Sequence, residues 1–247
     1  MRLTHAPAAL IAALVLVGCG VQTGLPGRNM PERAALVATS DTSDLRTRAR
    51  SFLAVVADVE PVAEAECRAQ NPLRNCDFRI VVDDRPGMPP NAFQTLDAAG
   101  RPVIAFTLPL IAQVANADEL AFVLAHEAAH HIAGHLERAR QSAAAGAAVF
   151  GRIAGQMGGA DPASIRTAEQ FGAALAARSY SQEFELEADA LGTVIAAMAG
   201  YDPVRGAAFF ARLPDPGNRF LGTHPPNSAR LAIVRETAAR IGFVPTN

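Results

Sequence analysis

The chain has 247 residues, half of them hydrophobic, and a formal net charge of −2 at pH 7. This length and composition suffice for one buried core and a single folded domain. The near-neutral charge, without a strong basic block, argues against a nucleic acid as the principal partner. Abundant alanine and few strand-like segments predict an α+β fold that is mainly helical.

The first 18 residues have the pattern of a bacterial export signal. An apolar run over residues 8–17 follows Arg2 and is too short to span a bilayer as a stable helix. It ends in Leu16-Val17-Gly18-Cys19, which resembles the lipobox of bacterial lipoproteins. That resemblance implies removal of residues 1–18, acylation of Cys19 and, because Gly20 follows, anchoring in the outer membrane. The alternatives are an ordinary secretory signal and a buried hydrophobic N-terminus with an incidental cysteine.

Two segments connect this anchor to the rest of the chain. Residues 19–45 are rich in Gly, Pro, Ser and Thr, which predicts a flexible tether to a folded domain over residues 46–247. Cys67 and Cys76 would then lie in an oxidising compartment, where a disulfide between them would persist. Two unpaired thiols are the less favoured alternative, and the pair is not convincing as a metal site.

The first elements of the domain combine a helix and a small sheet. Apolar residues at helical spacing predict a helix over residues 45–69, broken near Pro61. Strand patterns follow at residues 78–82, 91–96 and 103–108, with a turn between the last two. These segments predict a small antiparallel sheet with a hairpin, placed ahead of the next helix.

That next helix carries the sequence HEAAH. Residues i and i+4 share one helical face, so His126 and His130 can direct two imidazoles at a single Zn²⁺. Glu127 lies beside them, where it can activate a water molecule at the metal. Asn116 is the predicted N-cap, with Glu119 three residues later.

A third ligand cannot come from the same helix. The longer pattern HExxHxxGxxH fails, since Ala133 and Leu136 stand where Gly and His are required. At 100° per residue, His135 lies about 180° around the helix from His126. We therefore expect that His135 cannot join the cluster unless the helix breaks.

A second helix, predicted over residues 179–199 and stopped by Gly200, supplies carboxylates. Glu185 and Asp189 lie one turn apart on one face. Glu185 would complete a His-His-Glu site, and Asp189 would orient a ligand imidazole. Glu183 and Glu187 are close alternatives on the same helix.

HEAAH, the ELEAD segment and Thr223-His224-Pro225, in this order, resemble the M48 family of zinc metallopeptidases. The resemblance covers about residue 46 to the C-terminus and implies a gluzincin-like domain with one Zn²⁺. It implies that His126, His130 and Glu185 bind the ion and that Glu127 is the catalytic base. It selects Glu185 because the family ligand stands four residues before the Asp.

The segment Asn91-Ala92-Phe93 resembles the edge strand that borders the active site of gluzincins. An edge strand has unpaired backbone groups, so an extended, unfolded polypeptide can add to it. The alternative is a hairpin with a structural role alone, and the two interpretations are compatible.

The remaining chain is predicted to be helical. Residues 143–160 form an Ala/Gly-rich arm in which Gly151, Gly155 and Gly159 recur every four residues, and Arg152 argues against a membrane span. Asp202-Pro203 starts another helix, and a final helix covers about residues 228–241. His224, in the loop between them, is inert, donates to the oxyanion, or blocks the open zinc position.

These features together predict a lipid-anchored zinc metalloendopeptidase with its catalytic domain in the periplasm. By resemblance, its substrates would be misfolded or misassembled envelope proteins. A periplasmic chaperone or assembly factor that rarely cleaves, and an amidase acting on cell-wall peptides, are the rival functions. An intact Glu127 favours an enzyme, because a binding module has no need of a catalytic base.

Overall fold

The structure is a computed structural model that describes residues 32–157, 161–179, 181–215, 217 and 224–245. The chain divides into two compact units, residues 1–41 and 42–247. Every residue of the predicted metal site lies in the second unit. The predicted signal sequence, Cys19 and Thr223 lie outside the described residues.

Helix α1 (Glu32–Gln70) corrects two expectations. It begins at Glu32, so residues 32–45 of the predicted tether are helical. It also continues through Pro61 instead of breaking there. Pro61 has no backbone N–H, so the carbonyl of Ala57 has no hydrogen-bond partner within the helix. Both residues lie on the exposed face, where water can satisfy that carbonyl. The opposite face buries Phe52, Val55, Val59, Ala63 and Cys67.

The sheet contains β1 (Arg79–Asp83), β2 (Ala92–Leu96) and β3 (Pro102–Thr107), in the order β1-β3-β2. The predicted hairpin is confirmed, because β2 pairs antiparallel with β3. The expectation of a purely antiparallel sheet is wrong, because β1 pairs parallel with β3. Residues 84–91 carry the chain from one edge of the sheet to the other, and this crossover leaves β1 and β3 pointing the same way. β2 remains at an edge.

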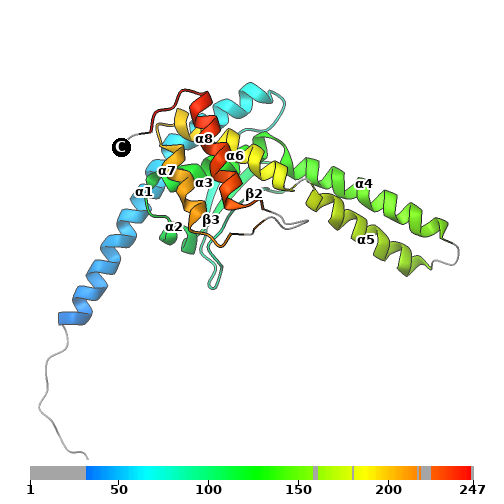
Figure 1. The fold of residues 1–247 in the computed structure, drawn as a ribbon. Helices are drawn as coiled ribbons and strands as arrows, with labels where there is room; N and C mark the ends of the chain where they lie inside the picture. The colour runs from blue at the N-terminus through cyan, green and yellow to red at the C-terminus, as the bar shows by residue number, and fades with distance from the viewer. Residues whose placement is uncertain (1–31, 158–160, 180, 216, 218–223, 246–247) are drawn as a thin grey trace, which may run out of the picture. The chain divides into compact units, whose positions relative to one another are not determined.

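Helix α3 (Ala117–Ile132) is the centre of the fold. It packs against α6 (Ser181–Met198), α7 (Pro203–Ala211) and β2, and α8 (Asn227–Arg240) covers α6 and α7 (Figure 1). The short α2 (Leu108–Gln113) leads from β3 into α3. Because neighbours surround α3, nearly all of its side chains are buried. The predicted helical fold with a small sheet is confirmed.

Most of the predicted Ala/Gly-rich arm, residues 143–160, lies in α4 (His135–Gln156), which packs side by side with α5 (Pro162–Ser179) (Figure 1). Their backbones approach most closely at Gly146 and Gly172, where any side chain would collide with the other helix. Of the predicted glycine repeat, Gly151 makes a close contact, whereas Gly155 does not. Gly159 lies outside the described residues. Within the part of the chain that is described, no helix is long and apolar enough to cross a membrane.

Candidate metal centre

The start of α3 is fixed by polar side chains. Asn116 accepts a hydrogen bond from the Glu119 amide, as predicted for an N-cap. The Glu119 carboxylate does not return to the Asn116 amide as in a capping box; it accepts from the Ala115 amide at 2.7 Å and pairs with Arg212. This ion pair, between a buried Glu119 and an exposed Arg212, ties the first turn of α3 to the end of α7.

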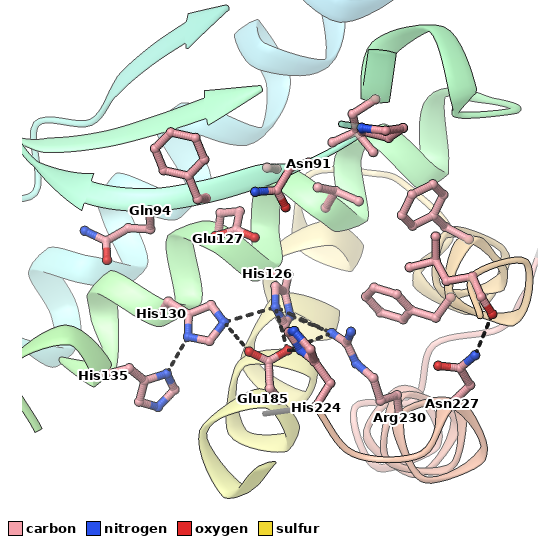
Figure 2. Close-up of a pocket in the computed structure, with 18 of the residues that line it drawn as sticks. Asn91, Gln94, His126, Glu127, His130, His135, Glu185, His224, Asn227 and Arg230 are labelled. Atoms are coloured by element: carbon pink, nitrogen blue, oxygen red, sulfur yellow. Dashed lines mark hydrogen bonds and ion pairs between the residues drawn. The ribbon is translucent and has the colours of Figure 1, made fainter. Parts of the chain in front are cut away.

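Three side chains from α3 and α6 converge on one point (Figure 2). The Nε2 atoms of His126 and His130 are 3.0 Å apart, and the Glu185 carboxylate oxygens lie 3.6 and 3.4 Å from them. One donor atom from each residue falls within 4.8 Å of the others. Two imidazoles and one carboxylate form a donor set of the kind that holds catalytic zinc, so these residues fit the ion.

The close approach of α6 to α3 at Gly192 brings these donors together. A Cβ atom at Gly192 would lie 3.0 Å from the backbone nitrogen of His126. A side chain at this position would therefore push apart the two helices that carry the ligands.

Asp189 and Arg230 support His126 from the buried side. Asp189 Oδ1 lies 2.9 Å from His126 Nδ1, the contact that the sequence predicts. Arg230, which the sequence analysis did not single out, donates to both Asp189 oxygens at 2.6 and 2.7 Å and stacks over the Phe210 ring. Burial raises the pKa of Asp189, but hydrogen bonds from Arg230 and His126 outweigh burial and hold it below its ordinary value.

His135 supports His130 from the other side, because the helix breaks. α3 ends at Ile132, Gly134 adopts a left-handed conformation (φ 71°), and His135 begins α4. His135 Nδ1 consequently lies 2.8 Å from His130 Nδ1. A helix that continued past Ile132 would have kept His135 away from His130, and the break at Gly134 overturns that expectation. His135 thus contacts the predicted ligand His130 but is not itself one of the metal donors.

The environment of His135 determines its protonation. Burial, followed by the nearby His130, lowers its pKa to about 4, so the ring is neutral at pH 7. Its Nε2 lies 3.2 Å from the Glu187 carboxylate, which can only accept. His135 Nδ1 must then accept from His130 Nδ1–H, which leaves His130 Nε2 as the ring nitrogen that faces Glu185. Arg138 anchors Glu187 at 2.7 Å.

The other predicted site residues line one cavity of about 500 Å³. Glu127 lies between Asn91 and His126 (Figure 2). His224 Nδ1 is 3.2 Å from Glu185 Oε2, and this hydrogen bond raises the pKa of His224 despite partial burial. His224 therefore faces the predicted ligands, a position compatible with either predicted functional role.

The edge of β2 forms one wall of the same cavity. Asn91, Ala92 and Phe93 all line it. Asn91 is fixed to β3, because its amide donates to Thr107 Oγ1 and its carbonyl accepts from the Thr107 amide, both at 2.9 Å. The outer edge of β2 has no strand partner within the described part of the sheet.

A disulfide-closed loop lies at the far end of α3. Cys67 and Cys76 are bonded, with their Cα atoms 5.7 Å apart. The Asn71 side chain donates to the carbonyl of Ile132 at 2.9 Å, and His131 donates to the carbonyl of Asn75 at 2.8 Å. The loop is thus held against the last turn of the helix that carries both predicted histidine ligands.

Comparison with known proteins adds one finding. The model of peptidase family M48 matches residues 52–238, which is more than half of the chain and includes every predicted ligand. No match was found among curated proteins.

Proposed function

Because the chain belongs to peptidase family M48, we propose that it is a zinc-dependent metalloendopeptidase. The observation that carries the proposal is the convergence of the His126, His130 and Glu185 donors in the cavity that Glu127 also lines. A histidine pair with two carboxylates, one a ligand and one free, supports metal-assisted hydrolysis of an amide bond.

Each residue has a distinct part in the proposed reaction. Bound Zn²⁺ would supply Lewis acidity toward the scissile carbonyl and the attacking water. Glu127 takes the proton from that water and later delivers it to the leaving amine. His224, whose Nδ1 lies 3.2 Å from Glu185 Oε2, would donate to the carbonyl oxygen as negative charge develops there.

The edge of β2 supports a polypeptide substrate. Backbone pairing with an edge strand does not depend on side chains, so it suits cleavage within unfolded segments of many sequences. The same edge would also serve a chaperone that captures unfolded clients.

Misfolded or misassembled envelope proteins remain our proposed substrates. In this proposal Cys19 is lipidated and holds the enzyme at the periplasmic face of the outer membrane.

The test compares wild-type protein with Glu127→Gln on unfolded casein, with zinc content measured on the same samples. We expect Glu127→Gln to keep its zinc and lose cleavage by at least about 10²-fold, since the ligands survive and the base does not. Glu236→Gln, at an exposed position on α8, is the matched control and should cleave normally. Equal cleavage by Glu127→Gln would reject the proposal, and capture of casein without any cleavage by the wild type would favour the chaperone.

A further inference from the structure

A second hollow of about 320 Å³ adjoins the catalytic cavity. The two are adjacent, because Gln94, His130 and Leu136 line both, and together they are called the cleft. The charged side chains that line the second hollow and have no part in the proposed metal site are Arg74, Arg140 and Glu137. The hollow therefore has an excess of positive charge beside the proposed site of hydrolysis.

Arg74 is held in place by the disulfide-closed loop. Its guanidinium packs against Gly134, where an added Cβ atom would lie 2.8 Å from Arg74 Nη2. Among the described residues, Arg74 Nε is the one buried side-chain polar atom without a hydrogen-bond partner. Burying part of a guanidinium without giving it an anionic partner costs free energy. This position is therefore suited to an anion from outside the chain.

The carboxylates of the protein do not supply that anion. Within the described ranges, neither Arg74 nor Arg140 has a carboxylate oxygen within 4.0 Å in an ion pair. Glu137 lines the hollow, but its carboxylate accepts a hydrogen bond from Gln141 at 3.0 Å. Both cations are thus available to a ligand in the cleft.

The β2 edge connects the two parts of the cleft. Residues 91–94 border the metal donors, and Gln94 and Leu96 border the second hollow. A strand advances about 3.3 Å per residue, so a substrate paired with β2 would reach the arginines about two to four residues from the scissile bond. Antiparallel pairing is the more frequent and slightly more stable mode. In that mode, the substrate residues beside the arginines lie on the amino side of the bond.

We propose that the Arg74–Arg140 hollow is a subsite for a glutamate or aspartate side chain of the polypeptide substrate, about two to four residues on the amino side of the scissile bond. This inference rests on the proposed peptidase function and adds a charge preference to it. A guanidinium pair binds a carboxylate by charge-assisted hydrogen bonds.

The experiment uses the intact zinc-loaded protein and fluorogenic peptides of one parent sequence. Glu, Ala or Lys is placed at each of the four positions on either side of the bond that is cleaved in the all-Ala parent. We expect kcat/KM to be about tenfold higher for Glu than for Lys at one or more of the second to fourth positions on the amino side. The preference should shrink as the salt concentration rises.

Charge reversal identifies the residues responsible. Arg74→Glu and Arg140→Glu should each reduce or invert the preference for Glu over Lys, measured as the ratio of kcat/KM for the two peptides on the same variant. Arg152→Glu makes the same charge change at an exposed position on α4 outside both hollows, and it should leave the preference intact. Thermal unfolding of each variant verifies folding, and Arg74→Gln serves if Arg74→Glu does not fold.

The outcomes separate the two proposals. Cleavage without a charge preference, or a preference that survives both reversals, rejects the subsite and leaves the peptidase function standing. A preference confined to the carboxyl side rejects the proposed position and indicates parallel binding. If Arg74→Gln lowers the stability but leaves the preference for Glu unchanged, the role of Arg74 is to stabilise the C-terminal carbonyls of α3. That result also rejects the subsite. Failure to cleave any peptide overturns both proposals.

Discussion

The two predicted histidine ligands are supported by regions of contrasting character. Behind His126, Asp189 and Arg230 are almost completely buried, with 0% and 8% of their side chains exposed. Behind His130, only His135 is buried, and the chain of contacts ends in Glu187 and Arg138, which are 44% and 41% exposed. The first support belongs to the core of the fold, whereas the second extends from the site to the surface.

This difference indicates that one side of the site contributes mainly to the stability of the fold and the other mainly to the affinity for the metal. Removing one partner of a buried ion pair leaves an uncompensated charge, which is strongly destabilising. Exposed pairs contribute little, because water screens them and long side chains lose entropy on pairing. We therefore expect the Asp189 side to determine whether the domain folds, and the His135 side to adjust how tightly the site holds its metal.

The largest effect is expected for Asp189→Ala. It removes the closest partner of the buried Arg230 guanidinium and leaves Glu185 Oε2, at 3.6 Å, as its remaining carboxylate contact among the described residues. The free energy of unfolding should therefore fall by about 3–5 kcal/mol, with loss of zinc. Denaturant unfolding and metal analysis measure the two effects. The double variant Asp189→Leu with Arg230→Met should recover much of the stability but not the zinc affinity. Undiminished stability in Asp189→Ala would contradict the assignment of this pair to the core.

A smaller effect is expected for His135→Gln. Loss of the imidazole that orients His130 should weaken zinc binding by about 10–100-fold, measured by competition with a chelator. The unfolding midpoint of the metal-free protein should change far less than in Asp189→Ala. His131→Gln is the control, because His131 faces the disulfide-closed loop and should leave zinc affinity nearly unchanged.

The smallest effect is expected for Glu187→Gln. The amide oxygen can still accept from His135, and the ion pair with Arg138 is half-exposed, so zinc affinity should fall by less than about threefold. Glu185→Gln, by contrast, removes a predicted ligand and should lower zinc occupancy greatly. If Glu187→Gln proves the more damaging of the two, the ligand assignment is displaced by two residues.

The donors of the site could be predicted because local spacing determines them. His126 and His130 share a helical face by arithmetic alone, and the position of Asp189 relative to Glu185 selected the carboxylate through a family resemblance. Helix starts at Asn116 and Asp202 followed equally from local hydrogen bonding, and both caps form. Such features need only a few consecutive residues.

The remaining parts depend on contacts between distant segments. Arg230 is 41 residues from Asp189, and nothing near it in the sequence indicates a buried ion pair. His135 was excluded because the helix was assumed to continue, although Gly134 directly before it signalled a left-handed break. The parallel pairing of β1 depends on a crossover whose direction residues 84–91 do not specify. Pro61 was taken as a break because the burial of its surroundings cannot be read locally.

Gly192 has a consequence for how sequence variation in this protein should be interpreted. In a saturation mutagenesis experiment scored by proteolysis, substitutions at Gly192 should be depleted, and the depletion should grow with the size of the side chain. The reason would be separation of α3 from α6, because an added Cβ atom would lie 3.0 Å from the His126 backbone nitrogen. A map of intolerant positions would therefore overstate the number of residues that take part in chemistry. It would count a spacer between two helices among the groups that bind or react.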